Sequence, residues 1–285
     1  MKLNNISGAG IGLRRGLVSP FLSHGDLSPV RFMEVAPENW MTVGGKAGRI
    51  FRQFAERFPM VLHGLSLSIG GPDELNIAFV KAVKKFKDEI KAPIYSEHLS
   101  YCTDGGQLYD LMPIPFTEAA VNHVADRIQQ VQDILGERMA MENVSYYLQQ
   151  PGAEMSEIDF INEVIKRADC LLHLDVNNVY VNSINHRYDP LQFLDQLPVD
   201  RIAYIHIAGH YNEAEDLIVD THGANVIEPV WNILKHTYRQ HGVFPTLLER
   251  DFNYPPVAEL ITEVSRIEAL QQQYGQQDHE QQAIV

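Results

Sequence analysis

The sequence predicts an α/β fold, a (β/α)8 barrel in which eight parallel strands alternate with helices. Eight short apolar runs, separated by amphipathic stretches, are the first reason for this prediction. The runs are too short for helices and lack a regular alternation of apolar and polar residues, which is typical of parallel strands covered on both faces. The main alternative is an open, doubly wound sheet, but no Gly-x-Gly-x-x-Gly loop follows the first run.

The predicted strands begin near the N-terminus and end close to residue 250, and the first of them is the weakest run. The eight runs are 8–13, 30–37, 59–67, 93–100, 138–143, 170–176, 201–209 and 244–250. Such a series of strands, each followed by a helical stretch, is what a closed barrel requires.

The intervals between the runs carry helical patterns. In residues 117–135 apolar side chains recur on one face, and Thr117 is a suitable N-cap. The same spacing marks Leu75, Phe79, Val83 and Phe86, and later Val257, Ile261, Val264 and Ile267. We therefore expect one barrel domain over residues 1–270, followed by a polar, glutamine-rich and flexible tail over residues 271–285.

Composition and charge exclude several classes of protein. Of the 285 residues, 45% are hydrophobic and 21% are charged, which is typical of a globular protein. No stretch approaches the roughly 18 apolar residues of a membrane helix, the N-terminus is a poor secretory signal, and two cysteines, Cys102 and Cys170, cannot form a disulfide framework. We expect a cytoplasmic protein without membrane contact. The net charge of −14 argues against a nucleic-acid partner and suits cation binding.

Potential metal ligands fall at or near the C-terminal ends of six successive predicted strands. They are His63, His98, Glu142, Asp175, His206 and Glu249. The active sites of such barrels lie at this end of the strands, so we expect the six side chains to converge there as the catalytic residues. A single histidine at a strand end is most often a hydrogen-bonded core residue. Three carboxylates and three histidines buried together are costly without a cation, so metal ions are the better explanation.

A second group of polar residues favours an adjacent site. Asp220 and His222 form an Asp-Thr-His triplet, and alternate residues of an extended segment point the same way. His210 follows His206 by four residues, and Asn177 follows Asp175 by two. Taken alone, Asp220 is explained equally well as a metal ligand and as a loop residue that forms a turn. Beside the six-residue set, the four residues Asn177, His210, Asp220 and His222 are expected to bind a further ion.

All of these ligands are nitrogen or oxygen, which disfavours iron–sulfur clusters and favours iron, manganese or zinc in a working site. Ten ligands suit two or three ions, with Glu142 as the expected bridge. Glu38, Asn143 and Arg250 flank the strand ends and are weaker candidates for holding substrate or orienting ligands. His173, two residues before Asp175, is interpreted as a core or ligand-supporting residue.

Several local motifs resemble one known family. They are GAGIGLR (8–14), MEVAPENWM (33–41), LHGLSLSIGG (62–71), YSEHLSY (95–101), MENVSYY (141–147), LDVNNVYVNS (174–183), YIHIAGH (204–210), DTHG (220–223) and LLERDFNYP (247–255). Together they resemble the multinuclear non-heme iron-dependent oxidases, a family that includes the iron subunit of the methanobactin biosynthetic enzyme. The order of the ligands is also similar to that of the xylose isomerase-like barrels, notably endonuclease IV.

The resemblance implies two or three irons, Fe2+ or Fe3+, with zinc or manganese as substitutes. By position, one iron is held by His63, His98 and Glu142. A second is held by Glu142, Asp175, His206 and Glu249, and a third by Asn177, His210, Asp220 and His222. Endonuclease IV has a histidine near position 177, whereas asparagine stands here, as in the oxidase branch. Asn178 is a possible substitute ligand.

The resemblance also implies a reaction and its partners. Family members oxidise cysteine residues of ribosomally made precursor peptides with dioxygen, and a separate partner protein delivers the leader of the peptide. The alternatives are a divalent-metal hydrolase of the endonuclease IV type and a sugar isomerase or epimerase. The negative net charge argues against a hydrolase that binds DNA. No lysine stands at a strand end, where a sugar isomerase or epimerase would need one beside its substrate. A metal-storing or partner-binding barrel is the non-enzymatic alternative.

Overall fold

The computed structural model describes residues 6–282, with eight parallel strands that form a closed barrel. The strands are β1 (Ala9–Gly12), β2 (Phe32–Val35), β3 (Met60–His63), β4 (Tyr95–His98), β7 (Ala140–Glu142), β8 (Leu171–Asp175), β9 (Ile202–Ile207) and β12 (Thr246–Leu248). Neighbouring strands follow the order β1-β12-β9-β8-β7-β4-β3-β2. The prediction of a (β/α)8 barrel is confirmed, and each of the eight barrel strands lies inside its predicted run.

Helices connect the strands. They are α1 (Val18–His24), α2 (Pro37–Trp40), α3 (Gly45–Arg57), α4 (Ile77–Ile90), α5 (Glu118–Leu135), α6 (Glu157–Ala168), α7 (Val176–His186), α8 (Pro190–Asp195), α9 (Glu228–His241) and α10 (Val257–Gln282), with short 3-10 helices η1 (Arg15–Leu17) and η2 (Val199–Arg201). Thr117 caps α5 as predicted, because its side chain accepts from the backbone N–H of Ala120 at 3.2 Å. Leu75 lies before α4, since Asn76 caps that helix by accepting from Phe79.

Two antiparallel hairpins were not predicted. β5 (Tyr101–Thr103) pairs with β6 (Gln107–Met112) after β4, and β10 (Tyr211–Ala214) pairs with β11 (Leu217–Val219) after β9. Their side chains are mostly exposed. Because such strands bury little apolar surface, they lack the hydrophobic signal that marks the barrel strands.

The chain divides into two compact units. Unit 1 contains residues Val35–His173 and Asp200–Ala203. Unit 2 contains the stretch that ends at Glu34, residues Leu174–Val199 and the stretch from Tyr204 onward. The prediction of a single domain over residues 1–270 stays a prediction.

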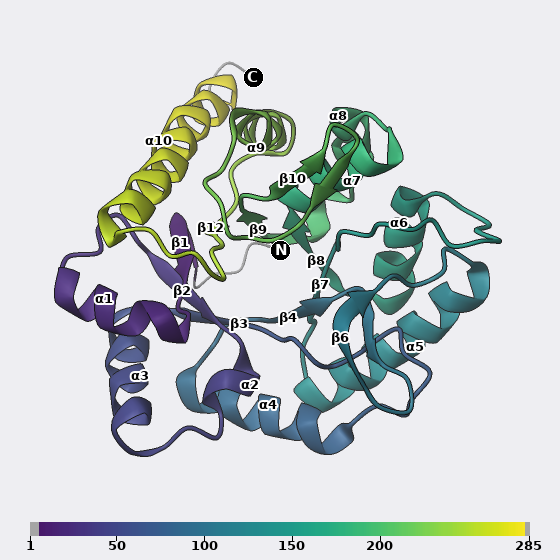
Figure 1. Ribbon diagram of the computed structural model, residues 1–285, viewed down its shortest axis with the longest axis horizontal. Helices are drawn as coiled ribbons and strands as arrows, with labels where there is room; N and C mark the ends of the chain where they lie inside the picture. The colour runs from purple at the N-terminus through teal and green to yellow at the C-terminus, as the bar shows by residue number, and fades with distance from the viewer. Residues whose placement is uncertain (1–5, 283–285) are drawn as a thin grey trace. The chain divides into compact units, whose positions relative to one another are not determined.

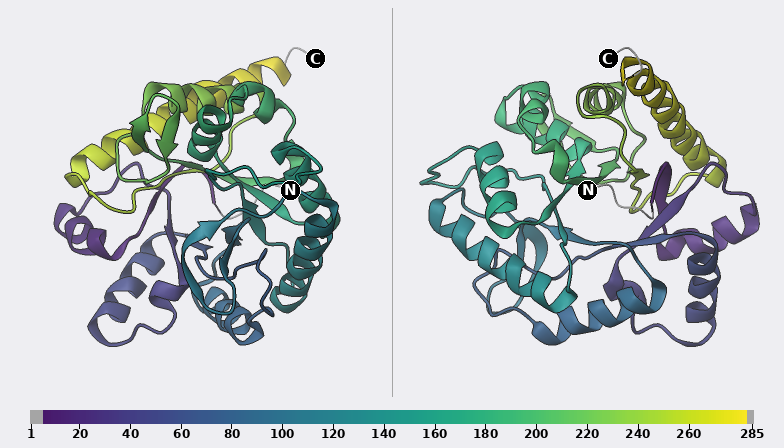
Figure 2. Two further views of the ribbon diagram at one scale, coloured as in Figure 1. Left: turned by 45° about the vertical axis from the view of Figure 1, so that its right-hand side comes forward. Right: turned by 180° about the vertical axis from the view of Figure 1, so that it is seen from behind.

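In unit 1, parallel pairing aligns the strand ends that carry the predicted ligands. His98 of β4 is in register with Glu142 of β7, and Glu142 is in register with His173 of β8. Helices α5 and α6 lie side by side in this unit, as both views in Figure 2 show. The register places three candidate side chains on neighbouring strands at the same level.

In unit 2, β1 pairs with both β12 and β2, and β12 pairs with β9. Helix α10 lies beside α9 (Figure 1) and continues through residues that the sequence predicted as a flexible tail. At the start of this stretch, the Gln271 side chain donates to the carbonyl groups of Gly8 at 3.1 Å and Phe244 at 3.0 Å. Within the described residues, no helix has both the length and the apolar character that crossing a bilayer requires.

Candidate functional site

In unit 1, three predicted ligands come together in one cluster. His63, His98 and Glu142 are the last residues of β3, β4 and β7. Oε2 of Glu142 lies 3.0 Å from Nε2 of His63 and 3.4 Å from Nε2 of His98, and the two imidazole nitrogens are 3.3 Å apart. His63 and Glu142 are buried, while His98 is slightly exposed. These residues are called the unit-1 cluster.

Neighbouring side chains determine which ring nitrogen of each histidine faces the unit-1 cluster. Nδ1 of His63 lies 2.9 Å from Oγ of Ser96, and that hydroxyl lies 3.3 Å from the carbonyl oxygen of Leu62. Nδ1 of His98 lies 3.5 Å from a carboxylate oxygen of Glu97. Both rings therefore present Nε2 to Glu142, which is the nitrogen available for a metal.

Two carboxylates, the buried Glu97 and the half-buried Glu38, hold the loop that follows β3. Glu97 accepts from the backbone N–H of Leu67 at 2.7 Å and of Ser66 at 3.1 Å. Glu38 accepts from the N–H of Leu65 and the hydroxyl of Ser66, both at 2.8 Å. Burial and then the charge of Glu97 raise the pKa of Glu38. Burial raises the pKa of Glu97, but contacts with His98 and the backbone outweigh it and leave the pKa lowered.

His173 lies beside the unit-1 cluster. Its ring is fully buried and meets the His63 ring edge-on, with centroids 5.0 Å apart. One of its nitrogens lies within 4.8 Å of ligand atoms of His63 and Glu142. The position agrees with the expected core or ligand-supporting role.

In unit 2, three further predicted ligands meet. Asp175 is the last residue of β8, His206 lies in β9, and Glu249 directly follows β12. Nδ1 of His206 lies 2.9 Å from Oε2 of Glu249 and 3.9 Å from Oδ2 of Asp175. All three are buried, and each offers a ligand atom within 4.8 Å of the others. These residues are called the unit-2 cluster.

Arg14 was not among the predicted site residues, yet its side chain contacts the unit-2 cluster. Its Nη2 lies 2.7 Å from Oε1 of Glu249, and its Nε lies 2.6 Å from Oδ1 of Asp251. Burial raises the pKa of Glu249, but the positive charges of His222, His206 and Arg14 outweigh it and hold the pKa well below its usual value. Glu249 is therefore ionised, with Oε1 occupied by Arg14 and Oε2 directed at the histidines.

The four residues predicted for a further ion form a continuous chain of contacts in unit 2. Oδ1 of Asn177 lies 2.7 Å from Nδ1 of His210, and its Nδ2 donates to Oδ1 of Asp220 at 2.9 Å. The same Asp220 oxygen lies 2.7 Å from Nε2 of His222. These residues are called the loop cluster. His222 also joins the unit-2 cluster, because its Nδ1 lies 3.1 Å from Oε2 of Glu249.

The backbone argument for the loop cluster was wrong in two places, although the side chains do meet. Asn177 lies in the first turn of α7 rather than on an extended chain, because Asp175 caps this helix and accepts from the N–H of Asn178 at 2.6 Å. His222 has a positive φ of 50°, so the Asp-Thr-His segment is not extended there. A left-handed turn, rather than strand alternation, brings His222 to Asp220.

Asp251 is a further residue that sequence reasoning missed. Its Oδ2 lies 3.3 Å from Nδ1 of His222, and His222, Glu249 and Asp251 form a group whose ligand atoms lie within 4.8 Å of one another. Burial raises the pKa of Asp251, but Arg14 and His222 outweigh it and lower the pKa. Its position two residues after Glu249 was the signal that could have found it.

Two weaker candidates lie in buried positions. Arg250 is 3% exposed and donates to Asn225 at 2.8 Å and Glu263 at 3.3 Å, so its guanidinium group stabilises the protein interior. Asn143 is also buried and lines a small cavity between the β7 end and α6 in unit 1.

The donor atoms of unit 2 fit a metal ion. Among the described residues, Nε2 of His210 and Oε2 of Glu249 are buried and have no hydrogen-bond partner. Burial lowers the pKa of His210, which leaves a neutral ring with a lone pair. Nitrogen and oxygen donors of this kind suit divalent iron, manganese or zinc.

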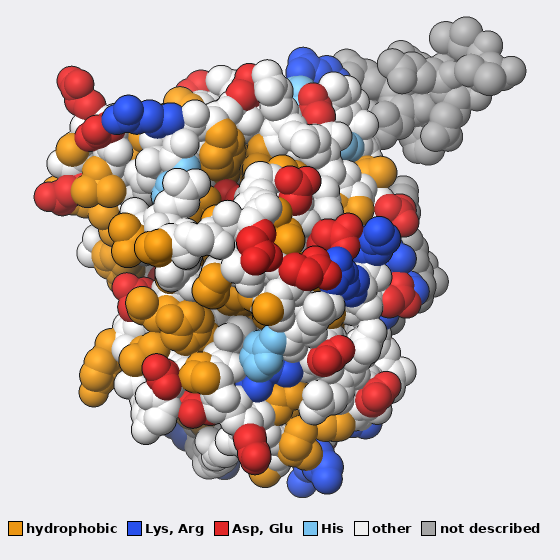
Figure 3. All heavy atoms as spheres, turned by 90° about the vertical axis from the view of Figure 1, so that its right-hand side faces the viewer, with side chains coloured by type: hydrophobic (Ala, Val, Ile, Leu, Met, Phe, Trp, Pro, Cys, Tyr) orange, Lys and Arg blue, Asp and Glu red, His pale blue; other side chains and the backbone are white. Residues whose placement is uncertain are grey.

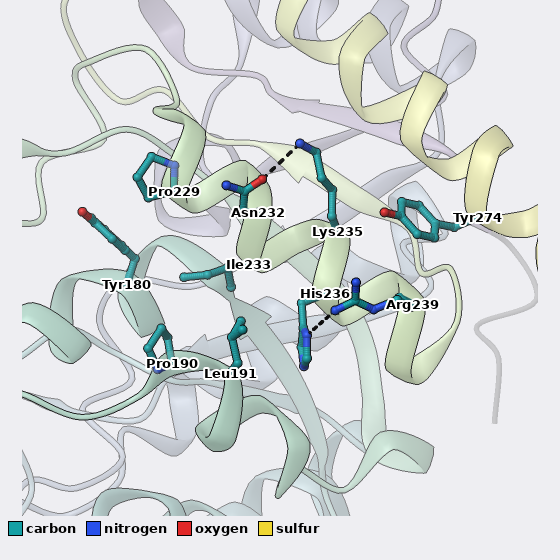
Figure 4. A pocket seen from close by; sticks show the side chains of 10 residues that line it. All are labelled: Tyr180, Pro190, Leu191, Pro229, Asn232, Ile233, Lys235, His236, Arg239 and Tyr274. Atoms are coloured by element: carbon teal, nitrogen blue, oxygen red, sulfur yellow. Dashed lines mark hydrogen bonds between the residues drawn. The ribbon is translucent and has the colours of Figure 1, made fainter.

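Unit 2 also has a hollow on its helical outer side, shown in Figure 4. Its volume is about 480 Å³. Helices α7 to α10 contribute its lining, which includes Tyr180, Leu191, Ile233 and Tyr274. At one side, His236 lies 2.7 Å from Asp195 and 2.9 Å from Arg239. None of the predicted site residues lines this hollow.

A barrel with clusters of acids and histidines at the ends of its strands defines a class of metal-binding barrels. The chain belongs to the MbnB/TglH/ChrH family, described as RiPP precursor modification enzymes, which matches residues 8–272. The family resemblance seen in the motifs is confirmed. The protein is thus a member of a family of enzymes whose substrates are precursor peptides.

Close relatives cover nearly the whole chain. A UPF0276 protein of Shewanella sediminis is 59% identical over 264 residues, which is 92% of this chain and 94% of the relative. A UPF0276 protein of Pseudomonas aeruginosa is 50% identical over 276 residues, 97% of this chain and 96% of the relative.

Solved structures agree on the fold. A 3-keto-D-glucoside 4-epimerase from E. coli has a TM-score of 0.62 and 12% identity, and covers 93% of this chain and 100% of its own. Endonuclease IV from Thermus thermophilus has a TM-score of 0.58 and 14% identity, and covers 95% of this chain and 100% of its own. At these identities the likeness shows a xylose isomerase-like barrel and nothing about activity.

Proposed function

We propose that the protein is a multinuclear non-heme iron oxidase that uses dioxygen to modify cysteine residues of a ribosomally made precursor peptide. The single observation that carries the proposal is the meeting of carboxylate and imidazole donors in each unit, without a sulfur ligand in the described clusters. Membership in a family of precursor-modifying enzymes supports the peptide substrate.

The proposed metal ligands are those of the three clusters. The unit-1 cluster supplies His63, His98 and Glu142, and the unit-2 cluster supplies Asp175, His206 and Glu249. The loop cluster supplies Asn177, His210, Asp220 and His222. The bridging role of Glu142 stays a prediction of the sequence. Iron, when bound, would supply a site for the cysteine thiolate and the electrons that reduce dioxygen.

The protein side chains prepare this site before the substrate arrives. Ser96 and Glu97 orient His63 and His98 so that both present Nε2. Arg14 holds Oε1 of Glu249 and leaves Oε2 to face the donor nitrogens. Glu38 and Glu97 fix the loop after β3 beside His63, which limits movement at the mouth of the unit-1 cluster. Such prior orientation lowers the cost of binding and of reaction.

Iron content and oxygen consumption test the proposal directly. Protein purified without oxygen should hold more than one iron per chain, and should consume dioxygen when given a cysteine-bearing precursor peptide and a separate leader-binding partner. His63→Ala should abolish consumption, whereas Glu215→Gln on the exposed β10–β11 hairpin should behave as wild type. Protein that holds only zinc and stays inactive with iron and peptide would contradict the proposal.

The hydrolase alternative receives less support. The net charge is −14, and on the face drawn in Figure 3 the Lys and Arg side chains are dispersed among acidic and apolar ones. Binding to a phosphate backbone relies on clustered basic residues. Cleavage of DNA at abasic sites by the zinc-loaded protein would favour this alternative over the oxidase.

A further inference from the structure

Glu34 lies at the end of β2 and is fully buried in unit 2. One of its oxygens, Oε2, lies 2.7 Å from Nε2 of His206 and 2.9 Å from the hydroxyl of Tyr204. Its other oxygen lies 3.5 Å from Nη2 of Arg14. Two donors on one oxygen fix the orientation of this carboxylate.

The contact determines which ring nitrogen of His206 is engaged by Glu34. A carboxylate oxygen and a ring nitrogen 2.7 Å apart share a hydrogen bond, so Nε2 of His206 is occupied. Nδ1 is then the nitrogen through which the ring can bind a metal. That nitrogen faces Oε2 of Glu249 at 2.9 Å and Oδ2 of Asp175 at 3.9 Å.

His206 thus differs from the histidines of the unit-1 cluster. His63 and His98 present Nε2 to Glu142, whereas His206 presents Nδ1 to its own cluster. Ring nitrogens are not interchangeable, because they set different distances from the backbone to the metal. The β9 strand therefore needs a partner that keeps the His206 ring in this orientation.

We propose that Glu34 is a positioning residue that holds the His206 ring through Nε2 and commits Nδ1 to the metal. The inference rests on the metal-binding part of the proposed function. A carboxylate behind a ligating histidine raises the basicity of the ligand and fixes its ring, and loss of such a partner typically costs roughly 10–100-fold in metal affinity. Tyr204, which donates to the same oxygen, would keep Glu34 in place.

Metal binding by Glu34→Gln, Glu34→Asp and Tyr204→Phe tests the role. The variants would be made in a His63→Ala/His98→Ala background, so that cobalt or iron reports on unit 2. For Glu34→Gln we expect the dissociation constant of the metal to be about 10-fold higher than in the parent protein. Glu34→Asp should recover part of this affinity, and Tyr204→Phe should lose less affinity than Glu34→Gln. The matched control is Glu259→Gln on the exposed face of α10.

A spectroscopic measurement separates positioning from general stability. In the cobalt-substituted protein, the hydrogen on Nε2 of His206 should give an exchangeable, paramagnetically shifted proton signal. Glu34→Gln should shift or remove this signal. Unchanged affinity and an unchanged signal in Glu34→Gln would overturn the inference. If that variant fails to fold, wild-type affinity and an unshifted signal in Tyr204→Phe would overturn it instead.

The test does not depend on the oxidase reaction. It uses metal alone, without peptide, partner or dioxygen. A protein that binds zinc and never oxidises a peptide would still obey the Glu34 inference while the proposed function failed. Conversely, iron-dependent oxidation with normal metal binding in Glu34→Gln would leave the function standing and remove the inference.

Discussion

Arg14 and Glu249 form an ion pair in unit 2, with Nη2 of the arginine 2.7 Å from Oε1 of the carboxylate. The Arg14 side chain is 17% exposed and the Glu249 side chain 5% exposed. The same guanidinium group reaches Asp251 through Nε at 2.6 Å. A fixed positive charge thus stands behind the carboxylates of the unit-2 cluster and neutralises part of their repulsion.

Loss of this charge should destabilise the metal-free protein. In Arg14→Met, two carboxylates lose their partner, and breaking a buried pair typically costs about 3–5 kcal/mol. We expect a decrease near the lower end, because Arg14 and Asp251 keep some contact with water. Urea unfolding in the presence of a chelator measures it, and bound metal should reduce the loss. An effect as small as that of Arg31→Met, an exposed pair with Glu268, would contradict this account.

The pH dependence of metal binding should reflect His222. Burial lowers the pKa of His222, but Asp220 and Glu249 outweigh it and raise the pKa well above its usual value. The metal-free ring is therefore protonated near neutral pH, and a metal must displace that proton. The affinity of His222 for a metal ion should therefore increase with pH until the pH exceeds the raised pKa of this ring. Calorimetry in buffers of different ionisation enthalpy should show proton release that disappears in His222→Gln.

The same shift predicts how pH affects folding stability without metal. A pKa that is raised in the folded state stabilises the protein fully below the unfolded value of about 6.5. This contribution is lost as the pH rises through the folded pKa. Denaturant unfolding from mildly acidic to alkaline pH, with chelator present, should show a decline that His222→Gln lacks. Parallel curves for both proteins would refute the prediction.

Asp251 should matter for the orientation of His222 more than for stability. Its side chain is 40% exposed, so Asp251→Asn is expected to cost about 1 kcal/mol or less. Asparagine weakens the hold on Nδ1 of His222, and the metal affinity of the loop cluster should fall several-fold. Equilibrium dialysis with cobalt measures the change. A large loss of stability without any change in affinity would assign Asp251 to the fold alone.

The protein's own thiols should resist the chemistry proposed for its substrate. Burial raises the pKa of Cys170 to about 12, and the residue is inaccessible to solvent. The thiol form is favoured, so its stabilising effect is complete below the unfolded pKa of about 8.5 and is lost as the pH rises toward the folded value. Iodoacetamide at pH 8 should leave Cys170 unlabelled until urea is added. Rapid labelling of the native protein would contradict this prediction.

The sequence predicted the barrel strands and the ligand types at their ends for one physical reason. Buried parallel strands need continuous apolar runs, and polar residues that end such runs are uncommon enough to be conspicuous. His63, His98 and Glu142 each end a strand, as expected. The residue types alone therefore indicated where metal-binding chemistry should be sought.

Contacts between distant residues could not be predicted in this way. Arg14 meets Glu249 across 235 positions, and Glu34 meets His206 across 172. No local spacing encodes these pairs, because the barrel itself brings their strands together. The left-handed turn at His222 was not predicted either, because a positive φ is uncommon for every residue except glycine, even though histidine adopts it more often than most.

The opposite ring orientations of His206 and His63 affect the choice of amide replacements. The side-chain nitrogen of asparagine occupies nearly the place of Nδ1 in an imidazole, and that of glutamine the place of Nε2. Asparagine is thus the closer isostere at position 206, and glutamine at position 63. A protein engineer who wants to weaken the binding of one ion without collapsing its pocket would therefore need a different amide in each unit.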